Sequence, residues 1–357
     1  MQILAIKAPS KDNPLIPKKA SDPAGQMPTV KRLFADLKKR FNKINKRMVE
    51  LVKEQKKYQK RAATNSVKYY RPLELYVNEL GELDTREGEL TVNKTYYEYQ
   101  IDELRYQSIN DYILRVLRAN LLESFDGTKP FNWFYQSYLE QSFIDGINDQ
   151  VYSAKSMADP AIVGEEITQQ IMSIDEDYIS PQQQQRLGLV YARVFEEMDG
   201  LTNSMKVDLA NTLTRGMADG LGITEISKNI QKRVQVGFSR AQRIARTEIM
   251  QSYRTATRSE QRDINANIYA DSDWNMQLLW WSALTSTTRK THAAKHGGIY
   301  DNQEVDDFYS EGANSINCYC NQGPVLVNKK TGETPQQDLI DKMLKQKQVW
   351  RVGMKGA

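Results

Sequence analysis

Residues 31–54 read KRLFADLKKRFNKINKRMVELVKE, and an apolar side chain recurs in this stretch at alternating steps of three and four. The positions are Phe34, Leu37, Phe41, Ile44, Met48 and Leu51. This spacing brings them onto one face of an α-helix, as in the seam of an amphipathic or coiled-coil helix. The other faces carry mainly Lys, Arg, Asn and Gln. The sequence therefore predicts a long basic amphipathic helix, which we assign to residues 31–66.

Positive charge is concentrated in this predicted helix. Between Lys31 and Arg61, thirteen Lys or Arg residues stand against three acidic residues, a local net charge of +10 in a chain of net charge +4. A basic arm on a mildly acidic body indicates a polyanion or an acidic protein surface as its neighbour. The residues expected to make this contact are Lys38, Lys39, Arg40, Lys43, Lys46 and Arg47. The alternative is a helix docked on its own domain, with its charges simply solvated.

The flanking segments differ in composition. Residues 1–30 contain five prolines, which predicts an extended tail. Residues 67–200 read as a helical body, interrupted between Tyr69 and Thr95 by a short hairpin or irregular excursion. Helical segments are expected over 96–124 and 131–151, and Pro160 and Pro181 mark two further helix starts. This body contains no glycine-rich phosphate loop and no alternating β-α repeat.

The rest of the chain predicts a compact mixed module over 201–330, followed by a C-terminal tail over 331–357. Its expected helices are two within 201–236, divided at Gly220–Thr224 with Thr224 as a cap, one over Phe238–Tyr269, and one bearing His292 and His296. Leu278–Trp281 and Val325–Val327 read as strands, and Tyr300–Ile316 reads as a loop. The predicted fold class is mainly α: a multi-helix body with a basic N-terminal helical arm and a small α+β C-terminal module.

All histidines and cysteines of the chain lie within 29 residues, at His292, His296, Cys318 and Cys320. On a helix the two histidines would share one face, and the two cysteines flank Tyr319. A structural Cys2His2 zinc centre is chemically possible, and the alternative is a pair of unbonded thiols beside two hydrogen-bonded imidazoles. A zinc protease is not expected, because Ala293 stands where that helix motif needs a glutamate base.

Size and composition exclude further classes. At 41.1 kDa the chain can bury a substantial core. No apolar run is long enough for a membrane span, and the first ten residues lack a signal-peptide core. We expect a protein kept in a reducing cytosol, where a Cys-x-Cys pair is poor evidence for a structural disulfide.

Three signatures follow one another in the last part of the chain. They are RAQRIARTE at 240–248, Trp281 followed by TRKTHAAKHG at 288–297, and NCYC at 317–320. In this order they resemble the phage minor head protein family, also called Mu F-like head morphogenesis proteins, over about residues 205–325. The matching positions are Arg246, Thr247, Glu248, Trp281, Thr288, Arg289, His292, Gly297, Cys318 and Cys320. Thr285, Thr287 and Tyr319 depart from the family pattern, which weakens any transfer of a catalytic or metal-binding role.

The resemblance implies a low-copy virion protein at the portal vertex that acts in head assembly and DNA packaging and is carried with the DNA at ejection. Its implied partners are the portal protein, other head proteins and packaged DNA, and it would pass through the host cytoplasm during assembly. Under this interpretation the protein is not an enzyme. Arg246, Thr247, Glu248, Trp281, Arg289 and Gly297 are structural, with Arg246 and Glu248 tying the long helix to the module, and any zinc is structural too.

Two other functions stay open on the sequence alone. A hydrolase or transferase could use the region of His292, Arg246 and Glu248, with His292 or His296 as acid or base. The sequence offers it no activated nucleophile, acidic metal cluster or cofactor loop. Alternatively, residues 31–61 could make the chain a non-specific DNA-binding protein.

Overall fold

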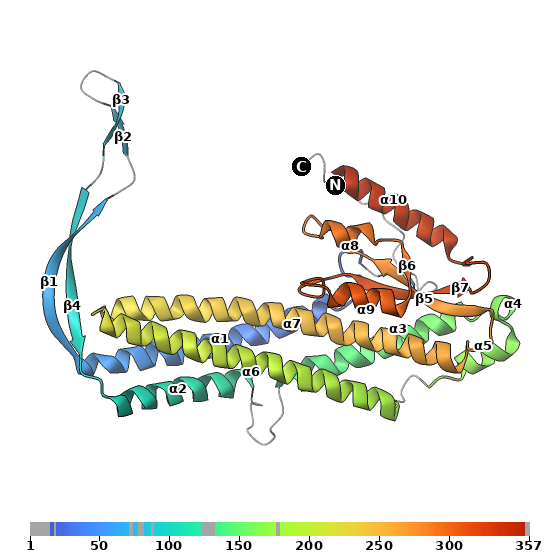
Figure 1. The fold of residues 1–357 in the computed structure, drawn as a ribbon, viewed down its shortest axis with the longest axis horizontal. Coiled ribbons are helices and arrows are strands. Elements are labelled where there is room, and N and C mark those ends of the chain that lie inside the picture. Colours follow the sequence, from blue (N-terminus) through green and yellow to red (C-terminus); the bar gives the residue numbers. More distant parts are fainter. Residues whose placement is uncertain are drawn as a thin grey trace. The chain divides into compact units, whose positions relative to one another are not determined.

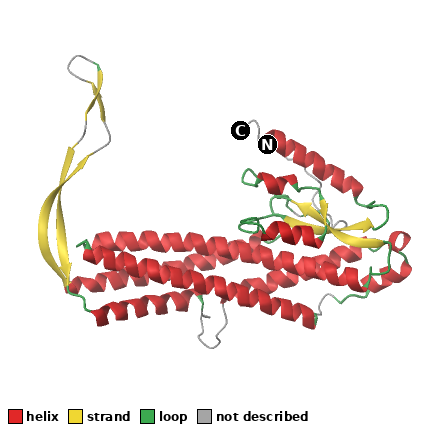
Figure 2. Ribbon diagram, in the orientation of Figure 1, coloured by secondary structure: helices red, strands yellow, loops and turns green. Residues whose placement is uncertain are grey.

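The computed structural model describes residues 15–17, 19–70, 74–77, 82–86, 89–122, 133–175 and 179–353. Helices dominate, and strands form only small sheets of two or three (Figures 1 and 2). The predicted fold class, mainly α with a small α+β module near the C-terminus, is confirmed. Two compact units are present. We call Met1–Leu37, Asp126–Met198 and Arg240–Ala357 the core unit, and Lys38–Phe125 and Asp199–Ser239 the arm unit.

Four helical segments pack together in the arm unit. They come from α1 (Met27–Glu54), α2 (Glu103–Leu121), α6 (Pro181–Ala218) and α7 (Ile223–Asn267). The predicted apolar seam of α1 is buried, with Ile44 and Met48 at most 1% exposed. Phe41 contacts Phe238 of α7 with ring centroids 5.3 Å apart. The amphipathic helix is thus confirmed, although it ends at Glu54 and not near residue 66.

A long two-stranded ribbon takes the place of the last part of that predicted helix. After a 3-10 turn, η1 (Gln55–Tyr58), strand β1 (Gln59–Tyr70) pairs antiparallel with β4 (Glu89–Tyr99). A smaller pair joins β2 (Glu74–Val77) to β3 (Leu83–Arg86). The side chains of Thr64 and Thr95 hydrogen-bond across the ribbon. The excursion predicted between Tyr69 and Thr95 is therefore part of a much longer hairpin, and residues 96–99 are strand and not helix.

Helices of the core unit pack closely against α7. They are the π-helical turn η2 (Tyr135–Leu139), α3 (Glu140–Met157), α4 (Pro160–Val163), α5 (Glu165–Met172) and the first part of α6. Ser142 Oγ donates to the Ile249 carbonyl, and Ser252 Oγ donates to the Leu139 carbonyl. The helix starts predicted at Pro160 and Pro181 are confirmed, and Asp159 caps the first by accepting from the Ala161 amide.

A three-stranded antiparallel sheet forms the centre of the C-terminal module. Its order is β6 (Ile299–Tyr300), β5 (Trp274–Trp281), β7 (Asn321–Asn328). Alternation along β5 sends Leu278 and Trp280 to one face and Leu279 and Trp281 to the other. The first pair packs with Val305 and Tyr309 of α9 (Asn302–Ser310), and the second with residues of α10 (Gln337–Gly353) such as Met343. Helices α9 and α10 therefore lie on opposite faces of the sheet, as Figure 1 shows.

Three sequence-based predictions about this module are wrong. The 300–316 segment contains helix α9, which begins with a capping box between Asp301 and Glu304. The 331–357 tail contains helix α10, which is held by apolar residues such as Ile340 and Trp350. Thr224 lies inside α7 rather than capping it. Half of the predicted N-terminal tail, residues 1–14 and 18, lies outside the described residues. In the described half, residues 19–25 form turns and α1 already begins at Met27, so this part is not an extended tail. Within the described part of the chain, no helix is long and apolar enough to cross a membrane.

Candidate functional site

The loop over 311–320, between α9 and β7, is bonded to three of the motif residues, Arg246, Thr247 and Arg289. Arg246 of α7 donates from a guanidinium nitrogen to Asn317 Oδ1 at 2.5 Å, and the Asn317 amide donates to Thr247 Oγ1 at 3.0 Å. Asn317 has a φ of +56°, a left-handed conformation that few non-glycine residues adopt without local support. The two neighbouring side chains of α7 therefore hold the turn that directly precedes the cysteine pair.

A second arginine, which belongs to the motif at residues 288–297, holds the same loop. Arg289, which precedes α8 (Lys290–Ala294), donates to the carbonyls of Asn314 at 3.2 Å and Ile316 at 2.6 Å. The same guanidinium lies 3.2 Å from His292 Nε2. Because arginine only donates, this contact assigns Nε2 as the acceptor and leaves the proton on Nδ1.

His292, Cys318 and Cys320 form a buried cluster at the end of this loop. The His292 Nδ1 atom lies 3.3 Å from Cys318 Sγ and 3.5 Å from Cys320 Sγ. The three side chains are 2%, 4% and 3% exposed, and the two cysteines are not joined by a disulfide. The backbone amide of Cys320 also donates to Cys318 Sγ at 3.3 Å. This set could hold a metal ion, since its three candidate ligand atoms lie within 4.8 Å of one another.

A buried arginine lies beside the thiols. Arg254 of α7 donates to the Tyr309 hydroxyl and to the Cys320 carbonyl, each at 3.2 Å. Burial by itself would lower the pKa of Arg254, but Tyr309 and the two cysteines together raise it. The pKa of Cys318 is lowered well below its usual value, first by its hydrogen bond with Cys320, and then by His292 and Arg254 against the effect of burial. The local chemistry therefore favours a thiolate at Cys318.

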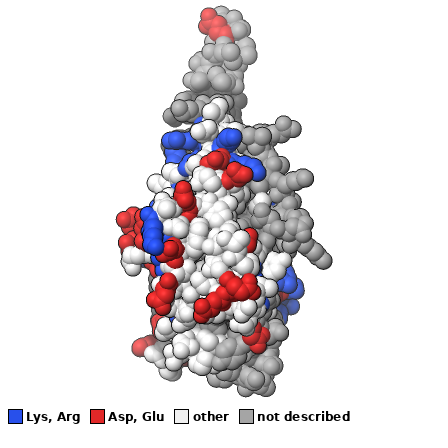
Figure 3. All heavy atoms as spheres, turned by 90° about the vertical axis from the view of Figure 1, so that its right-hand side faces the viewer, with Lys and Arg blue, Asp and Glu red and all other residues white. Residues whose placement is uncertain are grey.

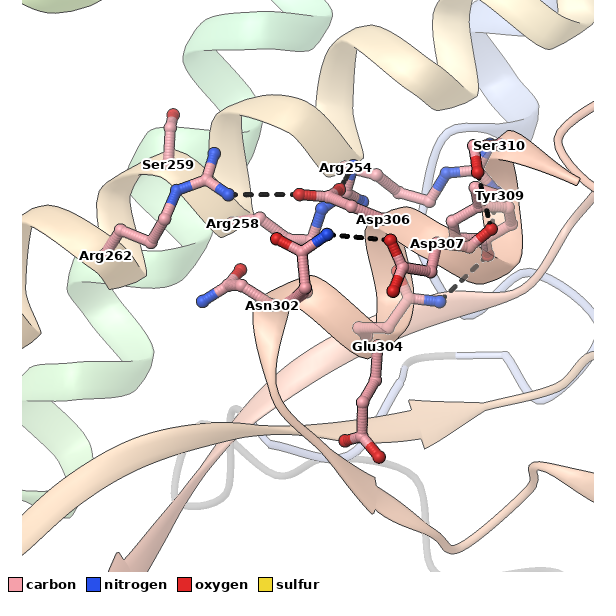
Figure 4. Close-up of polar contacts among 12 residues, drawn as sticks. Arg254, Arg258, Ser259, Arg262, Asn302, Glu304, Asp306, Asp307, Tyr309 and Ser310 are labelled. Atoms are coloured by element: carbon pink, nitrogen blue, oxygen red, sulfur yellow. Dashed lines mark hydrogen bonds and ion pairs between the residues drawn. The ribbon is translucent and has the colours of Figure 1, made fainter.

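Arg254 is the first of three arginines at intervals of four along α7. Figure 4 shows Arg254, Arg258 and Arg262 pointing from α7 toward Asp306 and Tyr309 of α9. Arg258 and Arg262 form ion pairs with the two carboxylate oxygens of Asp306, at 3.0 and 3.2 Å. Burial lowers the pKa of Arg258. This row was not predicted from the sequence, although its spacing of four on a predicted helix was the available signal.

His296 is not part of the cluster. Helix α8 ends at Ala294, so the two histidines do not share a helical face. The Ser282 amide donates to His296 Nδ1 at 3.0 Å, and His296 Nε2 lies 3.3 Å from Gln346 Oε1 of α10. The expected four-ligand set is therefore corrected to three residues.

The other motif residues with a predicted structural role, Glu248, Trp281 and Gly297, lie at other positions in the core unit. Glu248 accepts two hydrogen bonds from Arg193 of α6, at 2.7 and 3.1 Å, so it ties α7 to α6 and not to the module. Burial raises the pKa of Glu248 against the opposing effect of Arg193. Trp281 packs edge-on to His296 with ring centroids 6.0 Å apart. Gly297 has a φ of +75°, and a Cβ there would lie 3.2 Å from side chains of α10.

Most of the expected contact residues on α1 are exposed. Lys38, Lys39, Lys43, Lys46 and Arg47 present their side chains to the surface of the arm unit. Arg40 is the exception, because it is 2% exposed and donates to the Asn120 carbonyl of α2 at 2.9 Å. Its place on the buried side of the helix removes it from the expected contact set. On the face drawn in Figure 3, acidic and basic side chains are interspersed over a largely uncharged surface.

Comparison with known proteins identifies one family. Residues 207–322 match the model of the family described as phage Mu protein F like protein. This segment contains all three motifs, the row of arginines on α7 and the His292, Cys318 and Cys320 cluster. The resemblance inferred from the motifs is thereby confirmed for this part of the chain. Neither the curated proteins nor the solved structures include a significant match to the chain.

Proposed function

We propose that this protein is a phage head morphogenesis protein, built into the virion as a minor head component. The observation that carries the proposal is the match of residues 207–322 to the phage Mu protein F like family. The geometry supports a structural role for the matched segment, because the side chains of Arg246, Thr247 and Arg289 all form hydrogen bonds with one internal loop. A rigid module of this kind is suited to presenting a fixed surface to neighbouring subunits.

Catalysis by the same residues has less support. His292 and Glu248 are 2% and 6% exposed, and Glu248 is engaged by Arg193 of another helix. Arg246 bonds to Asn317, and its guanidinium lies between the rings of Phe34 and Tyr319. A general acid or base must come within hydrogen-bond reach of a substrate. The core unit has a cavity of about 540 Å³, but its lining does not include His292, Glu248, Arg246 or the cysteine pair.

We further propose that the protein works at the portal vertex in low copy and acts in DNA packaging. The portal protein, other head proteins and packaged DNA would be its partners, and it would leave the particle with the DNA. Exposed lysines of α1 support an anionic partner, either nucleic-acid phosphate or an acidic portal surface. Packaged DNA would supply such phosphates in a particle that we propose is assembled in the host cytoplasm.

The test is to locate the protein in particles of the phage that encodes it. Mass spectrometry of purified heads should find the chain at far lower copy than the major capsid protein. A reconstruction without imposed icosahedral symmetry should place its density at the unique vertex. Heads that lack the chain would overturn the virion assignment, whereas density distributed over all vertices would overturn only the portal association.

A knockout tests the morphogenesis role separately. Without the gene, the phage should give aberrant or unfilled heads, and the wild-type gene supplied in trans should restore them. Normal, infectious particles from the knockout would contradict the proposal even if the chain is present in wild-type virions.

A further inference from the structure

We propose that His292 Nδ1, Cys318 Sγ and Cys320 Sγ bind one zinc ion, with a water molecule as the fourth ligand. The inference does not depend on the proposed role in phage heads. It concerns the internal chemistry of the module and would hold for any function of the chain.

The two nitrogen–sulfur separations are close to those of a zinc coordination sphere, and all three atoms lie within 4.8 Å of one another. With zinc–sulfur and zinc–nitrogen bonds of the usual lengths, a sulfur and a nitrogen at a tetrahedral angle lie about 3.6 Å apart. The observed separations from His292 Nδ1 are 3.3 Å to Cys318 and 3.5 Å to Cys320. One ion can therefore reach all three atoms with only small adjustments of the side chains.

The surroundings of Cys318 Sγ favour its charged form. The hydrogen bond with Cys318 and burial raise the pKa of Cys320, so the ion itself has to displace the Cys320 proton. The Cys320 amide donates to Cys318 Sγ, which stabilises negative charge on that sulfur. Arg254 is fully buried and has its guanidinium beside Tyr309 and the Cys320 backbone, so the site already contains a positive charge that attracts thiolates. Thiolate and imidazole together are the ligands that select zinc among the common divalent ions.

The loop that carries the cysteines is rigidly held before any metal arrives. Arg246 and Thr247 fix Asn317 directly ahead of Cys318, and Arg289 fixes the Asn314 and Ile316 carbonyls. A metal site gains affinity when its ligands need not be ordered on binding. These three motif residues, Arg246, Thr247 and Arg289, therefore have a common task, which is to present both sulfurs to His292.

The fourth ligand comes from outside the protein side chains. Among the described His, Cys, Asp and Glu residues, only these three converge on one point. Tyr309 lies near, with its hydroxyl 3.8 Å from Cys318 Sγ. Its oxygen already accepts from Arg254 and Gln322, and its pKa is raised well above the usual value, so it remains a neutral phenol and a poor ligand.

Binding requires a defined movement of protons. Both cysteines must reach the ion as thiolates, so any thiol proton passes to solvent, and the Nδ1 proton of His292 is replaced by zinc while Nε2 gains one. Arg289 then keeps its two carbonyl acceptors and gives up its contact with Nε2, because two donors would face each other there.

Metal content of the full chain tests the proposal. The protein should be produced without a metal-affinity tag and analysed for zinc as isolated and after reconstitution with zinc followed by removal of excess ion. We expect about one zinc per chain. Cobalt substitution should give thiolate-to-cobalt charge-transfer bands and the intense visible bands of tetrahedral cobalt. Wild-type protein with less than about a tenth of this zinc in both preparations would overturn the proposal.

Matched variants identify the ligands. His292→Ala, Cys318→Ser and Cys320→Ser should each lose zinc and the cobalt bands. His296→Gln is the control, because His296 is equally buried in the same segment and should keep both signals. Tyr309→Phe should keep them as well. Retention of zinc in both cysteine variants, or its loss in His296→Gln folded by circular dichroism, would assign the metal elsewhere and refute this site. If the cysteine variants do not fold, the zinc content of the wild-type protein and its cobalt spectrum still decide whether a thiolate metal site is present.

Discussion

Single side chains determine the course of the loop before the cysteine pair. Asn317 occupies a left-handed conformation because Arg246 and Thr247 bond to its side chain and its amide. The sequence could identify Arg246 and Thr247 as structural residues, since both belong to a recognisable motif. It could not show what they bind, because Asn317 lies about seventy residues further along the chain and only the packing of α7 brings them together.

Arg246→Lys should destabilise the core unit. The Arg246 guanidinium lies 5.1 Å from the ring centre of Phe34 and 5.0 Å from that of Tyr319, and lysine cannot reproduce this planar stacking together with the bond to Asn317. We expect a loss of about 1–2 kcal/mol in the free energy of unfolding, measured by chemical denaturation. Arg243→Lys, at an exposed position of the same helix, is the control and should change stability by less than about 0.5 kcal/mol. Equal effects of the two would contradict the stacking argument.

His296 should make the fold sensitive to mild acid. Burial lowers the pKa of His296 to about 4, from an ordinary value of 6.5. The unfolded chain therefore takes up a proton first, so the stabilising contribution is complete above pH 6.5 and is lost as the pH falls toward 4. The loss amounts to about 3 kcal/mol over this range.

Denaturation curves recorded at several pH values would measure this effect. His296→Gln keeps a polar side chain but cannot titrate, so its stability should change less between pH 6.5 and 4 than that of the wild type. Parallel pH profiles for the two proteins would rule out His296 as the origin of the acid sensitivity.

At the scale of elements, periodicity predicted most helices but missed the β-ribbon that comes after α1. The basic pattern of α1 continues into Lys56, Lys57 and Lys60, and this continuity favoured a longer helix. The cross-strand partners that make residues 59–70 a strand lie in residues 89–99, beyond the reach of any local pattern. Helix α9 was predictable from its Asp301 and Glu304 capping box. Helix α10 was overlooked because its apolar residues need the sheet beneath them to define a buried face.

Contact between α3 and α7 depends on a glycine. A Cβ added at Gly146 would overlap the Tyr253 carbonyl oxygen, and it would lie 3.0 Å from the Cβ of Ala256. A backbone oxygen cannot move aside by a side-chain rotation. Gly146→Ala should therefore push the two helices apart and lower the free energy of unfolding by about 2–3 kcal/mol. Gly188→Ala is the control, because its added methyl would meet no atom within 4 Å and should be neutral or slightly stabilising. Thermal unfolding of both variants would show the difference directly, and a neutral Gly146→Ala would contradict the close packing.

At the scale of the whole molecule, the uneven charge of the chain predicts how it meets nucleic acid. The five exposed cationic side chains of α1 form a basic surface on the arm unit, whereas the face in Figure 3 mixes both signs. If this surface binds DNA phosphates, affinity of the full chain for duplex DNA should fall linearly with salt on a double logarithmic plot, without sequence preference.

Two variants with the same net charge distinguish DNA binding by the basic surface of α1 from an effect of the overall charge of the chain. Replacing Lys38, Lys43 and Lys46 with Gln should reduce the magnitude of the salt slope by about 2–3, since each phosphate contact contributes nearly one unit. The control replaces three exposed cations of α10, Lys342, Lys345 and Arg351, with Gln and changes the net charge equally. Its slope should match that of the wild type, because cations that contact no phosphate release no counterions and do not enter the slope. Fluorescence anisotropy across a salt series measures both slopes. Equal slopes for the two variants would show that α1 is not the DNA contact, and no binding at low salt would leave an acidic protein surface as its partner.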